Sequence, residues 1–96
     1  MKTNPAEKSN DYLFRAILSL ESVEECKSFL ETLCTAQELR SFSQRLTVAR
    51  MLYENCVYNQ IVTETGASTA TISRVSRSMQ DGNGYEKIFE RLRDDA

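Results

Sequence analysis

The chain has 96 residues, of which 41% are hydrophobic and 27% charged, a balance typical of a single folded domain over residues 1–96. No apolar run approaches the length of a membrane span, and residues 1–10 lack the apolar core of a signal peptide. We therefore expect a cytoplasmic protein without a membrane partner. The formal net charge of −2 argues against a protein that binds nucleic acid through overall positive charge.

Strand signals are absent, whereas apolar residues recur at i, i+3 and i+4 along the chain, which predicts an all-α protein with six helices. Ser22 with Glu25, and Thr35 with Glu38, have the spacing of a capping box, so the second and third helices are expected to begin directly after Ser22 and Thr35. The third helix is apolar on more than one side, which is typical of a central, buried helix. We expect helices at about residues 6–20, from 23, from 36 to about 55, and at about 58–64, 68–79 and 85–93.

Histidine is absent, and Cys26, Cys34 and Cys56 form no pair with CxxC spacing. This pattern argues against a zinc site or a disulfide framework, and we interpret the three cysteines as buried apolar thiols. The chain also shows no nucleophile–base pattern and no glycine loop that could cradle a phosphate. We therefore expect that the protein is not an enzyme and needs no cofactor.

Residues 60–75, QIVTETGASTATISRV, have the pattern of two short helices joined at Gly66. In a 20-residue helix-turn-helix unit that begins at Tyr58, the packing positions are occupied by Ile61, Thr65, Ala67, Ile72 and Val75. Four of these residues are apolar, and Thr65 fits in part through its methyl group. Gly66 falls at the turn, where a positive φ is needed, and Ser68 is a candidate N-cap. The alternative is a plain packing hairpin.

The second helix of such a unit, which we call the recognition helix, can lie in the major groove of double-stranded DNA with its first residues at the base edges. Its hydroxyls can bind bases or phosphates, small methyl groups can touch thymine, and arginines can pair with phosphate or guanine. The free N–H groups at the start of the preceding helix favour a phosphate. The predicted DNA contacts are Asn59, Gln60, Ser68, Thr69, Ala70, Ser73, Arg74 and Arg77. The alternatives are a solvated Ser/Thr-rich face, solvated arginines and simple helix capping.

Charge is distributed unevenly along the chain. Residues 37–79, which hold the helix-turn-helix pattern, carry five basic and three acidic side chains, whereas residues 1–36 and 80–96 each have a net charge of −2. Local positive charge is what phosphate binding requires, but a segment of +2 is weak. We therefore expect modest DNA affinity and a shallow salt dependence per subunit.

Residues 35–92 resemble the Trp repressor family, in particular its bacterial branch of the YerC/YecD type. The resemblance rests on TAQELRSFSQR at 35–45, on the central helix and on GASTATISRVSRSM at 66–79, while residues 1–34 match in helical layout only. It implies a six-helix fold that forms an intertwined homodimer. In it, residues 1–34 would be dimerisation helices, 35–55 the central helix, 57–79 the helix-turn-helix and 85–93 the C-terminal helix. The implied activity is transcriptional repression through a palindromic operator.

In the Trp repressor, tryptophan lies between the central and recognition helices, against two arginines, a threonine and a serine, with a glycine that leaves space for it. The resemblance places the corresponding effector pocket at Thr35, Arg45, Arg74, Val75 and Ser78. Val75 replaces the glycine, and a valine there can fill the space of an indole, so we predict that this protein does not bind tryptophan. For Arg45, a structural role is favoured over a ligand contact, and if partly buried it would need a carboxylate or carbonyl partner.

Three functions follow from these patterns. The favoured one is a dimeric regulator that reads a short palindrome in double-stranded DNA. A second is a regulator with a small-molecule effector other than tryptophan, bound near Thr35, Arg45 and Arg74. A third is a helical protein-interaction module that does not bind DNA.

Overall fold

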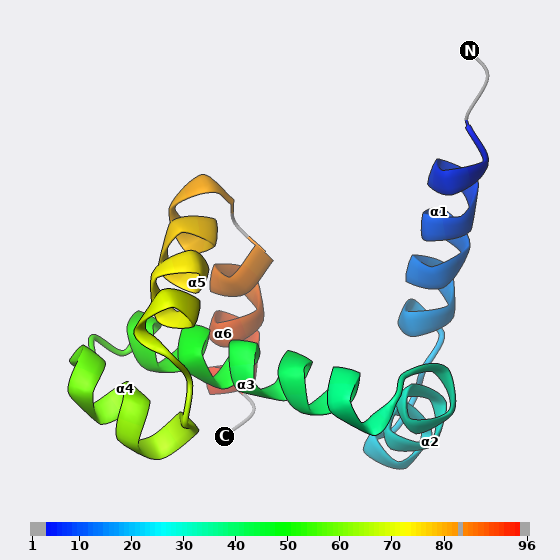
Figure 1. Ribbon diagram of the computed structural model, residues 1–96. Helices are drawn as coiled ribbons and strands as arrows, with labels where there is room; N and C mark the ends of the chain where they lie inside the picture. The colour runs from blue at the N-terminus through cyan, green and yellow to red at the C-terminus, as the bar shows by residue number, and fades with distance from the viewer. Residues whose placement is uncertain (1–3, 83, 95–96) are drawn as a thin grey trace. The chain divides into compact units, whose positions relative to one another are not determined.

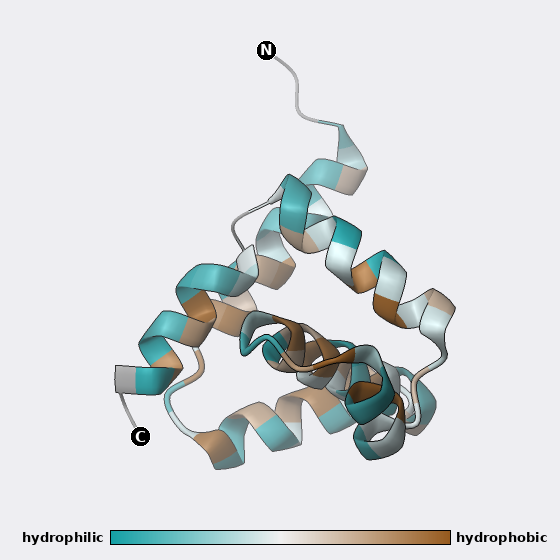
Figure 2. Ribbon diagram, turned by 90° about the vertical axis from the view of Figure 1, so that its left-hand side faces the viewer, coloured by the Kyte–Doolittle hydropathy of each residue, from teal (hydrophilic) through white to brown (hydrophobic). Residues whose placement is uncertain are grey.

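The computed structural model describes residues 4–82 and 84–94, and within them it contains six α-helices and no strand (Figure 1), as the sequence predicts. The chain divides into two compact units, residues 1–39 and 40–96, with the boundary inside the third helix. Hydrophobic and hydrophilic residues alternate along the helices (Figure 2), as expected of amphipathic helices. No helix among the described residues is both long enough and apolar enough to cross a membrane.

The first unit holds α1 (Pro5–Leu18) and α2 (Val23–Leu33), in neither of which is any residue buried. The predicted cap of α2 is confirmed, because the Ser22 hydroxyl accepts a hydrogen bond from the backbone N–H of Glu25 at 3.1 Å. Several large apolar side chains of both helices are exposed, with Leu18 at 86% and Val23 at 79% of their surface accessible, while others such as Leu13 and Phe29 are half-buried. These two helices thus carry apolar surface that their own unit does not cover.

The third helix, α3 (Ala36–Tyr53), begins at the predicted capping box. The Thr35 N–H donates to Glu38 Oε1 at 2.8 Å, and the Glu38 N–H donates to Thr35 Oγ1 at 3.1 Å. The Thr35 backbone N–H, with a further contribution from the Thr35 side chain, holds the pKa of the Glu38 carboxyl below its ordinary value. The cap is exposed to solvent. Because its two hydrogen bonds join residues three positions apart, the start of α3 is determined locally, at the residue that the sequence predicts.

The second unit contains the rest of α3 together with α4 (Tyr58–Thr65), α5 (Thr69–Asp81) and α6 (Gly84–Asp94). The third helix ends at Tyr53, earlier than expected, and Asn55 follows in a left-handed conformation with φ of 64°. The core of this unit consists of residues from all four helices and the turn: Val48, Ala49, Met51, Ile61, Ala67, Ile72, Val75 and Phe89. The predicted central, buried position of α3 therefore applies to its second half.

The C-terminal part of the chain extends α5 beyond the expected end at Met79, as far as Asp81. The predicted break over residues 81–84 occurs at Gly82, whereas Asn83 lies outside the described residues. Beyond it, Phe89 of α6 packs its ring 5.4 Å from that of Tyr53 on α3. Arg93 Nη2 also donates to the Tyr53 hydroxyl at 3.1 Å, so α6 contacts α3 through both a ring pair and a hydrogen bond.

The cysteines differ from the expectation. Cys26, Cys34 and Cys56 are half-buried free thiols rather than fully buried ones. Cys56 packs against the core of the second unit. Because α2 has no buried residue, Cys26 cannot be part of a closed core within its own unit.

The capping box at α3 predicts a pH dependence of stability. Because the folded-state pKa of Glu38 is lowered, the carboxylate stabilises the fold above its ordinary pKa of about 4.5, and this contribution is lost as the pH falls through the lowered value. Between roughly pH 5 and pH 3, the unfolding free energy of the wild type should therefore fall more steeply than that of Glu38→Gln, which keeps an acceptor but does not titrate. Urea unfolding across this range measures both slopes, and equal slopes would contradict the assignment.

Candidate nucleic-acid interface

The α4–α5 hairpin, residues 58–81, packs on α3 through the positions that the sequence predicts. Ile61 and Ile72 are fully buried, and Ala67 and Val75 are buried to within a few percent. Gly66 has φ of 71°, and its N–H donates to the carbonyl of Val62 at 2.9 Å, which ends α4. The space around Gly66 is open, so its requirement is conformational rather than steric.

Thr65 occupies the one polar packing position, and its hydroxyl explains why. Thr65 Oγ1 donates to the carbonyl of Ile61 at 2.7 Å and accepts from the N–H of Ala67 at 3.1 Å, which ties the last turn of α4 to the chain that follows. Its carbonyl accepts a hydrogen bond from Gln44 Nε2 of α3 at 3.1 Å. The sequence analysis missed Gln44, because a partner 21 residues away leaves no local signal.

The start of the recognition helix α5 is capped as predicted. Ser68 Oγ accepts from the backbone N–H of Thr71 at 3.1 Å and also donates to the Thr71 hydroxyl at 3.0 Å. The Ser68 hydroxyl is therefore engaged in the cap. The other predicted contacts of this helix are all exposed: Thr69, Ala70, Ser73, Arg74 and Arg77.

The start of α4 is different, because its N-cap residue, Val57, provides no side-chain hydrogen bond to the first turn. The free N–H groups there keep the partial positive charge that favours a phosphate. Asn59 and Gln60 are exposed beside them, although Gln60 Nε2 also lies 3.4 Å from Glu64 Oε1. Val57 and Tyr58 are exposed apolar side chains at the same end, which the sequence analysis did not select.

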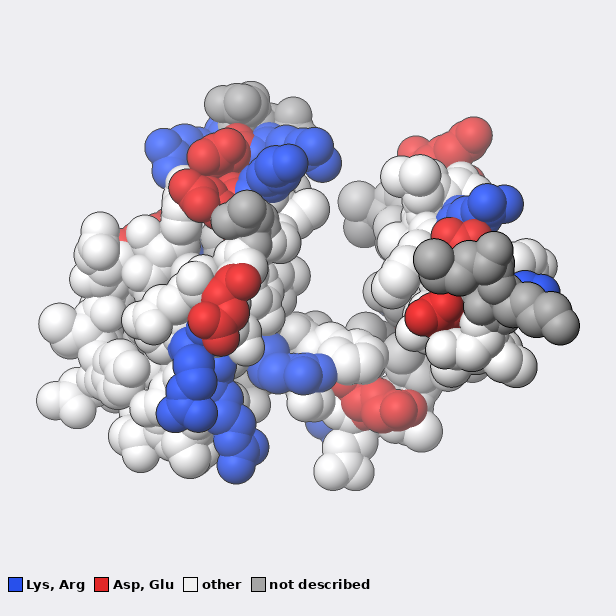
Figure 3. Space-filling model, turned by 90° about the horizontal axis from the view of Figure 1, so that it is seen from above, with Lys and Arg blue, Asp and Glu red and all other residues white. Residues whose placement is uncertain are grey.

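The charge on the surface is mixed. In the space-filling view, Lys and Arg side chains form small groups separated by uncharged surface, with Asp and Glu among them (Figure 3). No broad basic field is seen on this face, in keeping with the weak positive charge of residues 37–79. Binding to a polyanion would therefore depend on a few well-placed groups.

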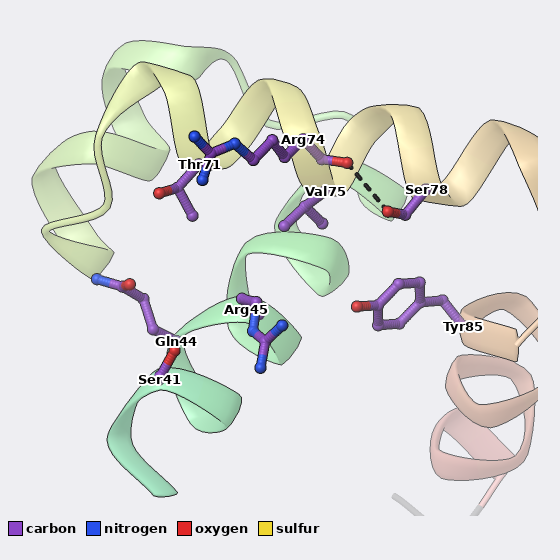
Figure 4. Close-up of a pocket in the computed structure, with 8 residues that line it drawn as sticks. All are labelled: Ser41, Gln44, Arg45, Thr71, Arg74, Val75, Ser78 and Tyr85. Carbon is purple, nitrogen blue, oxygen red and sulfur yellow. Dashed lines mark hydrogen bonds between the residues drawn. The ribbon is translucent and has the colours of Figure 1, made fainter. Parts of the chain in front are cut away.

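A hollow of about 480 Å³ lies within the second unit, between α3, α5 and α6 (Figure 4). Its lining is Ser41, Gln44, Arg45, Thr71, Arg74, Val75, Ser78 and Tyr85. In the close-up the Tyr85 hydroxyl points into the hollow from α6, and the Val75 methyl groups point toward α3. The lining is mostly polar, since Val75 and Tyr85 are the residues in it with large apolar surface.

Four of the five predicted pocket residues line this hollow: Arg45, Arg74, Val75 and Ser78. The fifth, Thr35, does not, because it caps α3 in the first unit. Val75 is 4% exposed and packs in the core, yet it leaves the hollow open rather than closing it. The Ser78 hydroxyl is occupied by a hydrogen bond to the carbonyl of Arg74 at 3.1 Å.

Arg45 is not buried, so it does not need a carboxylate or carbonyl partner. It is exposed, and its guanidinium lies over the ring of Phe42, one turn earlier on the same helix, with 5.1 Å from Cζ to the ring centroid. A cation above an aromatic face is weakly attractive and leaves the N–H groups free to bind elsewhere. No group of His, Cys, Asp and Glu among the described residues could hold a metal ion.

Comparison with known proteins places this geometry in context. Residues 8–93 match the sequence profile of the family described as "Trp repressor protein". A Bacillus subtilis (strain 168) protein named "Uncharacterized protein YerC" is 53% identical over 88 residues, which cover 91% of this chain and 85% of that protein.

Two crystal structures are also similar. A TrpR-like protein from Eubacterium eligens has a TM-score of 0.86 and 51% identity, covering 88% of this chain and 89% of its own. A putative Trp repressor from Staphylococcus aureus has a TM-score of 0.85 and 48% identity, covering 95% and 96%. At these identities the likeness extends to the sequence as well as to the fold.

The cap at the start of α5 yields a prediction about stability. Ser68→Ala removes the acceptor for the Thr71 N–H, so it should lower the unfolding free energy by about 1 kcal/mol. Ser73→Ala is the matched control, because Ser73 is exposed in the helix interior, where alanine costs nothing, and its effect should stay within about 0.5 kcal/mol. Urea denaturation followed by circular dichroism measures both, and equal losses would show that the Ser68 cap does not stabilise α5.

Proposed function

The chain belongs to the Trp repressor family, and we propose that it is a transcriptional regulator that binds double-stranded DNA as a homodimer and represses by occupying a short palindromic operator. The observation that carries this proposal is the α4–α5 hairpin. Its apolar side is fixed on α3, and the first two turns of α5 present Thr69, Ala70 and Ser73 to solvent. A helix held in this way can enter the major groove with these side chains at the base edges.

Phosphate contacts would hold the recognition helix in place. Arg77 is exposed on α5, and the uncapped start of α4 offers backbone N–H groups beside Asn59 and Gln60. Such contacts fix the orientation of the protein on the duplex but carry no sequence information. Because few charges are involved, affinity for a single half-site would be modest, which favours two linked copies.

The exposed apolar surface of the first unit supports a homodimer. Neither α1 nor α2 has a buried residue, and large apolar side chains such as Tyr12, Leu18 and Val23 are more than three-quarters exposed. Large exposed apolar patches typically mark protein–protein interaction sites, so these side chains are candidates for an interface. A second copy related by a two-fold axis would cover it and would present two recognition helices to two half-sites.

The hollow beside α5 supports a second candidate, regulation by a small-molecule effector other than tryptophan. Arg45 and Arg74 line it together with hydroxyl and amide groups, so a small anionic molecule would suit it better than an indole. Pockets for large apolar ligands are lined mostly by hydrophobic and aromatic side chains, which are a minority in this hollow.

The introduction of negative charge on α5 tests DNA binding. The double variant Thr69→Glu, Ser73→Glu places two carboxylates on the groove-facing side of α5, so it should weaken binding to duplexes selected from a random pool by at least about 100-fold. Fluorescence anisotropy in moderate salt without added ligand measures the affinity.

The control is Gln37→Glu, Gln80→Glu, which lowers the net charge equally at two exposed positions outside the first two turns of α5. If both double variants lost affinity equally, net charge rather than the α5 face would govern binding. If the wild type enriched no palindromic motif, the proposed function would be wrong. A protein partner retained by both variants would then favour the protein-interaction module.

The tryptophan prediction is tested by calorimetry. Because Val75 occupies the place where the Trp repressor leaves space, and because the lining of the hollow is polar, L-tryptophan should bind no more tightly than about 1 mM. Addition of L-tryptophan should also leave the DNA affinity of the wild type unchanged. Micromolar binding in the titration would refute the prediction.

A further inference from the structure

Gln44 links the central helix to the turn that precedes the recognition helix. Its side chain extends from α3 toward the segment that joins α4 to α5 (Figure 4), and Nε2 donates to the carbonyl of Thr65 at 3.1 Å. Within residues 4–82 and 84–94, this is the single hydrogen bond between α3 and the α4–α5 hairpin. Both residues are half-buried, so water competes with the bond only in part.

The core that α3 shares with the hairpin is apolar. Val48 and Ala49 are fully buried together with Ile61 and Ile72 in one core. Apolar burial is strong but non-directional, so it leaves small rotations and shifts of one helix on another weakly specified. A hydrogen bond weakens steeply with distance and angle and therefore defines a position.

The carbonyl that Gln44 binds lies close to the base-facing residues in the chain. Thr65 is the last residue of α4, and only Gly66 and Ala67 separate it from the Ser68 cap. Thr65 is also held by its own hydroxyl, which bonds to Ile61 and Ala67. The position of the Thr65 peptide is therefore transmitted through a short, hydrogen-bonded turn to the start of α5.

We propose that Gln44 is a positioning residue for DNA recognition: its amide fixes the turn at Thr65 and so sets the start of α5 relative to α3. The proposal rests on the proposed function. In this proposal Gln44 does not contact DNA. It affects discrimination between sequences and not the electrostatic affinity for any duplex. Electrostatic affinity for any duplex comes from exposed cations and helix ends, whereas discrimination between sequences needs the base-facing side chains to be correctly placed.

The test uses Gln44→Met, which has similar length but no donor, and Gln37→Met as the matched control. Gln37 is exposed on the same helix, and its side chain makes no hydrogen bond to another described residue. We expect Gln44→Met to fold, with a melting temperature lowered by no more than about 8 °C. Its affinity for the selected palindrome should fall by about tenfold, while its affinity for unrelated duplex stays within about twofold. Gln37→Met should change neither affinity.

A second measurement on the free protein keeps the proposal separate from the proposed function. Amide hydrogen exchange at Ala67 and Ile72, whose N–H groups donate to Thr65 Oγ1 and to the Ser68 carbonyl, should be faster in Gln44→Met than in Gln37→Met, while exchange in α6 stays the same. Unchanged exchange, or an equal loss of affinity for selected and unrelated duplexes, would overturn the role of Gln44 while leaving DNA binding by the wild type intact. Failure of the wild type to bind any duplex would overturn the proposed function, and with it the role in recognition.

Discussion

The second unit depends on the burial of one apolar face of the α4–α5 hairpin against α3. Ile61 and Ile72 come from the two hairpin helices and are both fully buried, so neither helix can leave α3 without exposing a large side chain. Complete burial of such a side chain is worth roughly 1.5–3 kcal/mol, a large part of the stability of a small domain. The polar face of α5 is free for binding because the opposite face is fully used in packing.

Features encoded by neighbouring residues were predictable from the sequence. The caps at Ser22, Thr35 and Ser68 and the left-handed turn at Gly66 follow from residue type and spacing over a few positions. Three-dimensional partners were not predictable in this way. Gln44 and Tyr85 both line the hollow, and Gln44 also binds the turn at Thr65. Tertiary packing brings them there, so no local sequence pattern marks them. Thr35, which the resemblance groups with the pocket residues, lies in the other unit, so its place in an effector pocket stays a prediction.

The first unit does not fully bury its own apolar residues. The apolar residues of α1 and α2 recur at the spacing that predicts helices, but this spacing does not state what covers them. Within the unit these residues are at most half-buried, whereas the second unit, over the residues that the structure describes, has a core of eight buried residues. The two units of the chain thus differ: the second has a buried core of its own, and the first has only exposed and half-buried apolar residues in α1 and α2.

Val75 connects the packing of the recognition helix to the question of an effector. It lines the hollow on one side and lies in the core, 4% exposed, on the other. A glycine at an interior helical position costs about 1 kcal/mol relative to alanine and contributes no buried side chain. A valine there supplies apolar burial beneath α5 from the chain itself. The apolar packing of α5 at Val75 therefore needs no ligand, although the hollow beside it stays open, and an effector there would act on a helix that is already packed on α3.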